Sequence, residues 1–160
     1  MDESVLNFGY LFEINFFNSP TSTTFGIGTA APNEGYINKS GNTYINYLFA
    51  TLPGISKVGS YSGTGNAINV DCGFTNGARF ILIKRTDTEI QGTGGTNWYV
   101  WDTARGIVSG NDPYLLLNST AAQVTNTDYV DPLSTGFTVT ASGATGLNVS
   151  GGTYMFLAIA

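Results

Sequence analysis

The stretch Arg79-Phe-Ile-Leu-Ile-Lys-Arg85 decides the fold class of this chain. Successive side chains of a strand point to opposite faces, and here both faces are apolar in the middle of the stretch while charged residues stand at its ends. A strand buried on both faces has such a nearly continuous hydrophobic run. The stretch therefore predicts a central strand of a β-sheet, with Phe80, Leu82 and Lys84 on one face and Arg79, Ile81, Ile83 and Arg85 on the other.

A second aromatic stretch, Trp98-Tyr-Val-Trp-Asp102, predicts the next strand. Its alternation puts Trp98 and Trp101 on opposite sides of the sheet. We expect one indole in the core and the other partly exposed or under a loop. Between the two stretches, Gln91-Gly-Thr-Gly-Gly-Thr96 is longer than a tight two-residue turn and predicts a flexible hairpin loop at the surface.

The rest of the chain has the same cadence of short β-prone runs separated by Gly, Asn, Asp or Pro. Helical periodicity is nearly absent, and a short helix over Ser119–Val124, capped by Ser119 or Thr120, is the one helical segment that the sequence allows. The cadence predicts an all-β fold, an antiparallel β-sandwich or jelly roll. The expected strands are Gly9–Phe17, Thr24–Thr29, Thr43–Ala50, Lys57–Ser62, Ala67–Asp71, Arg79–Thr86, Asn97–Asp102, Pro113–Leu117, Gly136–Ala141 and Thr153–Ala160.

The chain contains an internal repeat. Residues Ile37–Ala50 align without gaps on Leu147–Ala160, and the shared unit is a strand, an Asn-x-Ser-Gly turn and a second strand. The Asn and Gly of this turn suit a positive φ. We therefore expect residues 1–50 to hold amino-terminal strands with a partial copy of the carboxyl-terminal ones, residues 51–160 to form a complete sandwich, and 1–160 to make one compact domain.

Several sequence blocks, in order, resemble a domain of structural proteins from tailed phages, notably those of cyanobacteria, where it occurs in tail-fibre-like and other virion proteins and often in tandem. The blocks are Lys57-Val-Gly-Ser-Tyr-Ser-Gly-Thr-Gly65, Gly77-Ala-Arg-Phe-Ile-Leu-Ile-Lys-Arg-Thr-Asp87, Trp98-Tyr-Val-Trp-Asp-Thr-Ala-Arg-Gly106, Asn111-Asp-Pro-Tyr-Leu-Leu-Leu-Asn-Ser-Thr-Ala-Ala122 and Asp128-Tyr-Val-Asp-Pro-Leu-Ser-Thr-Gly-Phe137. The resemblance covers residues 51–160, and 25–50 resemble the end of a preceding copy. It implies a β-sandwich in a virion and transfers no catalytic residues.

Composition argues against several other functions. The chain has no histidine, which removes the usual neutral-pH base and the common triads, and its acidic residues are spread over turns and strand ends. The formal net charge is −5 and basic residues are scattered, so nothing predicts a nucleic-acid partner. A single cysteine, Cys72, allows no internal disulfide. We expect no enzymatic activity, no cofactor and no bound metal.

The expected location is the virion, after synthesis in the host bacterial cytoplasm. The amino terminus lacks the positive region of a secretory signal, and no stretch reaches the ~18 apolar residues of a membrane span. The first functional hypothesis is a capsid decoration (cement) protein that stabilises the head. Its expected partners are further copies of itself, in a trimer by analogy with the common assembly of such proteins, and the major capsid protein or other virion proteins.

Two surfaces are candidates for binding. The segment Gly9–Phe17 places Tyr10, Phe12, Ile14 and Phe16 on one side of a strand that either grips a neighbour or completes its own sheet. The alternative function, a tail or fibre component that recognises a host surface glycan, uses loop tips and aromatic rings. Its candidate residues are Gly94, Asn97, Tyr99, Trp101, Asn111 and Asp112, although strand aromatics are more often core.

Overall fold

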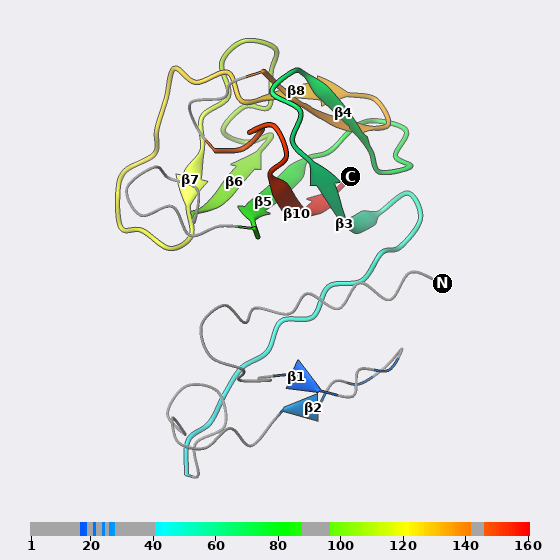
Figure 1. The fold of residues 1–160 in the computed structure, drawn as a ribbon, viewed down its shortest axis with the longest axis vertical. Coiled ribbons are helices and arrows are strands. Elements are labelled where there is room, and N and C mark those ends of the chain that lie inside the picture. Colours follow the sequence, from blue (N-terminus) through cyan, green and yellow to red (C-terminus); the bar gives the residue numbers. More distant parts are fainter. Residues whose placement is uncertain are drawn as a thin grey trace. The chain divides into compact units, whose positions relative to one another are not determined.

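The computed structural model describes residues 17–18, 21, 24, 26–27, 41–87, 97–141 and 146–160. The chain divides into two compact units, Met1–Leu48 and Phe49–Ala160. In the first unit, β1 (Phe17–Asn18) and β2 (Gly26–Ile27) pair antiparallel, with Phe17 opposite Ile27 (Figure 1). The sequence predicts longer strands over Gly9–Phe17 and Thr24–Thr29, and most of those residues lie outside the described ranges.

The described part of the second unit is made of strands, turns and loops, without a helix. All of its strand pairs are antiparallel, which confirms the predicted all-β class. The strands are β3 (Ser56–Ser62), β4 (Ile68–Asp71), β5 (Phe80–Arg85), β6 (Trp98–Asp102), β7 (Leu115–Leu116), β8 (Val130–Leu133), β9 (Gly136–Val139) and β10 (Thr153–Ile159).

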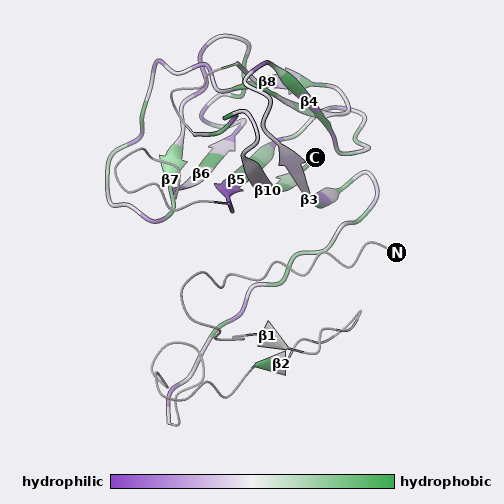
Figure 2. Ribbon diagram, viewed as in Figure 1, coloured by the Kyte–Doolittle hydropathy of each residue, from purple (hydrophilic) through white to green (hydrophobic). Residues whose placement is uncertain are grey.

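These strands form two open sheets, one in the order β3-β10-β5-β6-β7 and one in the order β4-β9-β8. The two sheets lie over one another as the layers of a sandwich (Figure 1). β5 lies between β10 and β6, as its apolar run predicts, and hydrophobic residues mark both β5 and β6 in Figure 2. The β5 side chains Ile81 and Ile83 are completely buried.

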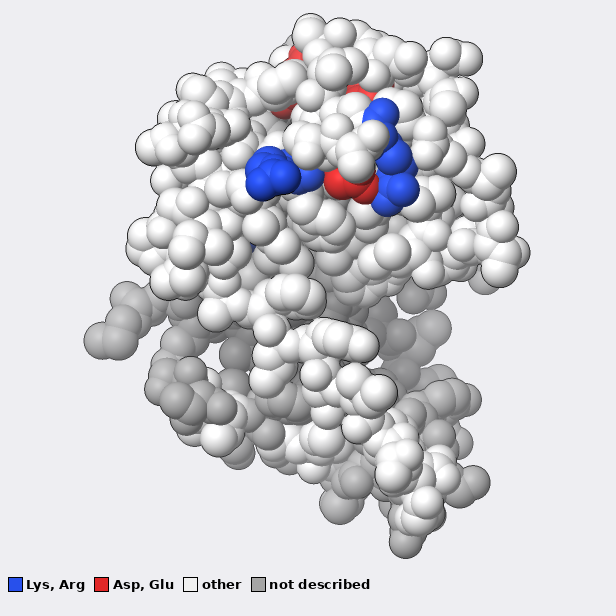
Figure 3. Space-filling view, turned by 180° about the vertical axis from the view of Figure 1, so that it is seen from behind, with Lys and Arg blue, Asp and Glu red and all other residues white. Residues whose placement is uncertain are grey.

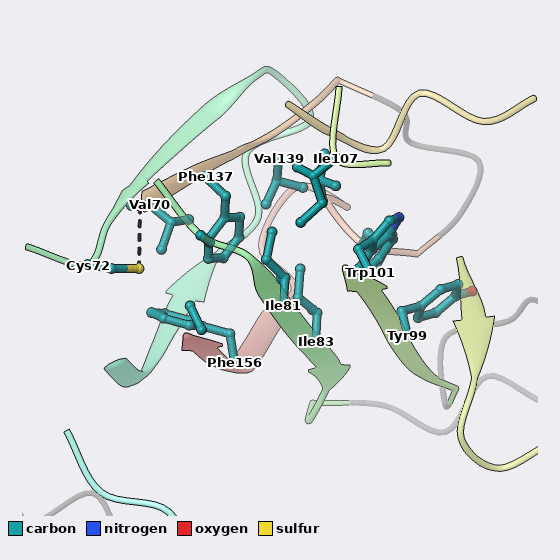
Figure 4. Close-up of a cluster of buried hydrophobic side chains, with 14 of the residues drawn as sticks. Val70, Cys72, Ile81, Ile83, Tyr99, Trp101, Ile107, Phe137, Val139 and Phe156 are labelled. Atoms are coloured by element: carbon teal, nitrogen blue, oxygen red, sulfur yellow. Dashed lines mark hydrogen bonds between the residues drawn. The ribbon is translucent and has the colours of Figure 1, made fainter. Parts of the chain in front are cut away.

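The core fills the space between the sheets. Figure 4 shows Ile81 of β5 near Phe137 and Val139 of β9, with Tyr99 and Trp101 on one side of β6. The rings of Phe137 and Phe156 meet edge to face with 5.4 Å between centroids, so β9 of one sheet contacts β10 of the other. This contact ties the sequence-distant end of the chain into the core.

Three details differ from the expected strands. β8 was missed because it contains Pro132, which usually argues against a strand. Here β8 is the edge of its sheet, where a residue without an N–H is tolerated. The helix over Ser119–Val124 is wrong: the Ala121 N–H donates to Ser119 Oγ in a local turn, and Val124 forms a bridge with Tyr114. The third difference, at Thr43–Ala50, belongs to the candidate interaction surface.

Candidate interaction surface

The segment just before β3 exposes a run of large hydrophobic side chains. Ile45 and Tyr47 are 81% and 80% exposed, and every residue from 41 to 55 is exposed. The large apolar members are Tyr44, Ile45, Tyr47, Leu48, Phe49, Leu52 and Ile55. Soluble monomers rarely expose a contiguous apolar patch of this kind, and such patches mark interaction sites. We name residues 45–50 the apolar arm.

The apolar arm is the sequence counterpart of β10. The glycine that precedes it is left-handed in both copies of the repeat: Gly41 has φ +82° and its equivalent Gly151 has φ +79°. After this turn the two copies differ. Thr153–Ile159 forms β10, held between β3 and β5, whereas residues 43–50 belong to no strand. The predicted strand Thr43–Ala50 is therefore wrong, since no described strand supplies it with backbone partners.

A tight turn connects the arm to β3, and the backbone pairing that it begins does not extend beyond Leu52 and Ser56. The Ile55 N–H donates to the Leu52 carbonyl at 3.0 Å across Pro53 and Gly54, a turn in which Gly54 takes φ +73°. Leu52 and Ser56 then exchange two backbone hydrogen bonds, both 2.9 Å.

Side chains replace the backbone at the next step of this hairpin. The Thr51 hydroxyl accepts from the Val58 N–H at 3.1 Å and donates to the Val58 carbonyl at 3.2 Å. Ser56 Oγ donates to the Ala50 carbonyl at 2.8 Å. These bonds occupy the groups that a continuing strand would use, so the chain leaves the edge of β3 at Ala50.

The repeated asparagine has a structural role at Asn148. The side chain is completely buried, its Oδ1 accepts from the Thr64 N–H at 2.9 Å, and its Nδ2 donates to the carbonyls of Asn66 at 2.6 Å and Thr140 at 2.9 Å. The sequence pattern indicated a positive φ for this Asn, but that conformation falls on Gly151. Asn148 instead ties three separated segments together through its side chain.

The loop-tip candidates fall into different environments. Asn97 is half-buried and its Oδ1 accepts from Asn118 Nδ2 at 3.0 Å, while Asn118 Oδ1 accepts from the Trp98 N–H at 3.0 Å. Asn111 is exposed. Gly94 lies outside the described residues. Asn97 therefore holds the start of β6 against the segment after β7 and is not presented at a free tip.

Asp112 is completely buried, which overturns its assignment to an exposed loop tip. Its carboxylate accepts from the backbone N–H groups of Tyr129, at 3.1 Å to each oxygen, and Val130, at 3.0 Å. Burial raises the pKa of Asp112 to about 6; nearby Asp128 and Asp131 also raise it, and the two backbone donors oppose them. The residue anchors the start of β8 and is not free to bind a ligand.

Tyr99 and Trp101 are core residues, so they do not form the exposed platform that a glycan would need. Trp101 is completely buried and Tyr99 is 5% exposed. Their rings stack with centroids 5.8 Å apart. Trp98 on the other face is partly exposed, with Lys84 Nζ 5.8 Å from its ring. One indole in the core and one partly exposed is the predicted arrangement.

Charged side chains are few on the surface. In the face drawn in Figure 3, two Lys/Arg patches flank an Asp/Glu patch and a few further acidic atoms lie apart from them, within a largely uncharged surface. Arg85 is nearly buried, pairs with Asp87 at 2.7 Å and lies over the Tyr154 ring; this pairing lowers the pKa of Asp87. Within the described ranges no cluster of three or more His, Cys, Asp or Glu side chains could hold a metal ion. That part of the chain also contains no helix able to cross a membrane.

The predicted interface residues of the amino-terminal segment, Tyr10, Phe12, Ile14 and Phe16, lie outside the described residues. The repeat predicts an apolar face on the partial copy in residues 1–50, which lacks the front half of the unit, and leaves open whether the second unit, a neighbouring subunit or the particle covers it. The exposed arm is the described part of that copy, although its residues were predicted as a strand.

Together these features define a two-layer β-sandwich, preceded in sequence by the most exposed apolar run among the residues that the structure describes. The chain matches the family described as a domain of unknown function (DUF7483) over residues 11–160, and it belongs to this family. No curated protein and no solved structure matches the chain. The family match continues through the boundary at Leu48, so the family domain includes residues of both units.

Proposed function

We propose that this protein is a non-enzymatic structural protein on the surface of a tailed-phage virion, where it acts as a capsid decoration protein that stabilises the head. The sequence blocks between Lys57 and Phe137 support this proposal through their resemblance to phage virion proteins. The β-sandwich is compatible with it, because this architecture presents rigid surfaces for assembly.

The observation that carries the proposal is the exposed hydrophobic run before β3. Covering Ile45, Tyr47, Leu48 and Phe49 would contribute on the order of 6–12 kcal/mol, at about 1.5–3 kcal/mol for each large apolar side chain. Association itself costs about 4–15 kcal/mol in lost freedom, so these residues supply a large share of what a stable contact needs. An exposed run that is rich in aromatic and aliphatic residues and poor in charge has the composition of an interface core.

A tail or fibre component remains the second candidate, since the same apolar surface would serve assembly at the tail. The glycan-binding form of that candidate receives less support, because Tyr99 and Trp101 are buried. The two locations differ in copy number: a decoration protein covers the head in amounts near those of the major capsid protein, and a tail component is present in far fewer copies.

The test is the copy number of the protein in purified virions, measured by quantitative mass spectrometry against the major capsid protein. Near-equal amounts support capsid decoration, and low amounts favour the tail candidate. Absence from the particles refutes both.

A second measurement asks whether the exposed run makes the contact. The purified Leu48→Asp variant should bind less tightly than the unmodified protein when it is added to virions from which this protein is missing. Leu117→Asp is the matched control, because Leu117 is also a large exposed side chain, 63% exposed, but lies outside the run. Equal binding by both variants would contradict a role for the run.

A further inference from the structure

The apolar arm has an unoccupied backbone as well as exposed side chains. Within the described part of the chain, no hydrogen bond reaches the backbone of residues 45–49, and these residues belong to no strand. The next backbone group, the Ala50 carbonyl, accepts from Ser56 Oγ. Most exposed backbone in a folded protein is paired within a strand or a turn. The N–H and C=O groups of residues 45–49 are therefore available to another molecule.

The arm lies at the boundary between the two compact units, which falls between Leu48 and Phe49. The described residues that form or contact the sandwich core all lie later in the chain, from Tyr61 onward. The hydrogen bonds that begin the second unit, at Thr51 and Leu52, also follow this boundary. A cut within the arm would sever the connection between the units and remove no described side chain from the core.

An endoprotease requires a segment of this kind. It binds its substrate in an extended form through main-chain hydrogen bonds, in the way that a peptide adds to the edge of a sheet. A segment whose backbone is already paired must first open locally, so its cleavage is limited by the small population of the open form. Residues 45–49 need no such opening. Exposed chain without backbone partners is where proteolytic nicking concentrates.

The composition of the arm selects the class of protease. Residues 40–56 contain no Asp, Glu, Lys or Arg, so an enzyme that requires a charged residue before the cut has no site there. Three consecutive large side chains, Tyr47, Leu48 and Phe49, are 80%, 72% and 59% exposed. Such side chains fit the hydrophobic specificity pocket of a chymotrypsin-like enzyme.

We propose that the apolar arm is a processing site, at which an endoprotease of chymotrypsin-like specificity hydrolyses the bond after Tyr47, Leu48 or Phe49. Water adds across the peptide bond, so that the residue before the cut gains a carboxylate and the residue after it gains an amino terminus. The carboxyl-terminal product contains the whole described core of the sandwich and stays folded. This inference goes beyond the proposed function and does not depend on it, because it concerns the free chain.

Leu117 provides a matched control within the same chain. Its side chain is 63% exposed, close to the 72% of Leu48, and the residue type is the same. Its backbone is paired, however: the Leu117 N–H donates to the Trp98 carbonyl at 3.0 Å, and the Ser119 N–H donates to the Leu116 carbonyl at 3.3 Å. If side-chain exposure decided cleavage, the two leucines would be cut alike. If an unpaired backbone decides it, the bond after Leu48 is cut first.

The test is limited proteolysis of the full, unmodified chain with chymotrypsin, in which new amino termini are labelled at successive times and quantified by mass spectrometry. Synthetic peptides of residues 43–54 and 112–123 give the intrinsic rates, so that the preferences of the enzyme for neighbouring residues cancel. After this correction, the bond after Leu48 should be cut at least about tenfold faster than the bond after Leu117, which must wait for local opening. Tryptophan fluorescence should stay unchanged, since both tryptophans lie in the sandwich.

Early amino termini at residues 48–50 together with unchanged fluorescence support the proposal. Equal corrected rates after Leu48 and Leu117 overturn it, and so does a chain that is not cut after residues 47–49 under conditions that cleave the peptide. A loss of fluorescence in step with the cut also overturns it, because the sandwich would then not survive as a product. The experiment contains no virion, so its result leaves the copy-number test of the proposed function unaffected.

Discussion

Replacing Asn148 with Ala should destabilise the sandwich strongly, because this one side chain makes three hydrogen bonds, two to residues 64–66 and one to Thr140. The substitution removes the acceptor for the Thr64 N–H and the donor for the carbonyls of Asn66 and Thr140. Each lost bond costs about 1 kcal/mol, and more where the remaining group stays buried. Thr64 and Asn66 are exposed residues whose groups water can reach, whereas Thr140 is half-buried. The expected loss in free energy of unfolding is therefore about 3–4 kcal/mol.

The assay is urea unfolding followed by tryptophan fluorescence. Both tryptophans, Trp98 and Trp101, lie in the second unit, so the signal reports that unit. Asn148→Asp is the informative comparison: it keeps an acceptor for Thr64 but at neutral pH turns a carboxylate toward two carbonyl oxygens. We expect Asn148→Asp to be at least as damaging as the alanine variant at pH 7. A loss below about 0.5 kcal/mol for Asn148→Ala, the size of an ordinary surface substitution, would refute the reasoning.

Three further predictions concern stability. The pKa of Asp112 in the folded state is about 6, above the unfolded value near 3.9, so folding favours the protonated carboxyl. The resulting contribution to the free energy of unfolding is fully present below about pH 4. It falls by about 2–3 kcal/mol as the pH rises to 6. Urea midpoints against pH should show this decline, and Asp112→Asn should flatten it; an unchanged slope contradicts the assignment. Gly136→Ala should cost more than about 3 kcal/mol or prevent folding, because the added Cβ would overlap the Val70 carbonyl oxygen. A wild-type melting temperature would disprove that overlap. Asp87→Ala should cost about 1–3 kcal/mol by leaving the nearly buried Arg85 unpaired, whereas a neutral result in the same unfolding assay would show that water solvates the guanidinium.

Local patterns predicted most of the sandwich. The run from Phe80 to Arg85 predicted a central strand, and β5 does lie between β10 and β6. Only its face with Ile81, Ile83 and Arg85 is buried; the face with Phe80, Leu82 and Lys84 is half-buried. The alternation around Trp101 correctly predicted one buried and one partly exposed indole. β8 was missed because Pro132 is tolerated only at a sheet edge, and a strand's place in the sheet is a property of the assembled fold.

The candidate sites were predicted less well. Asp112 and Asn148 both occur in turn-like sequences, where such residues are commonly exposed. Their burial depends on segments far away in the chain, residues 129–130 for Asp112 and 64–66 for Asn148. No local pattern records such contacts.

The sequence by itself determined the fold class, the central strand and the repeat, because each depends on side-chain periodicity or on similarity between two stretches of the chain. Only the tertiary structure decided that one copy of the repeated sequence forms a strand and the other does not. Thr153–Ile159 forms β10 because β3 and β5 satisfy its backbone, whereas residues 43–50 follow a glycine of the same conformation and have a similar sequence pattern but are exposed. A strand forms where neighbours supply hydrogen bonds and cover its side chains, and those neighbours are set by the whole chain.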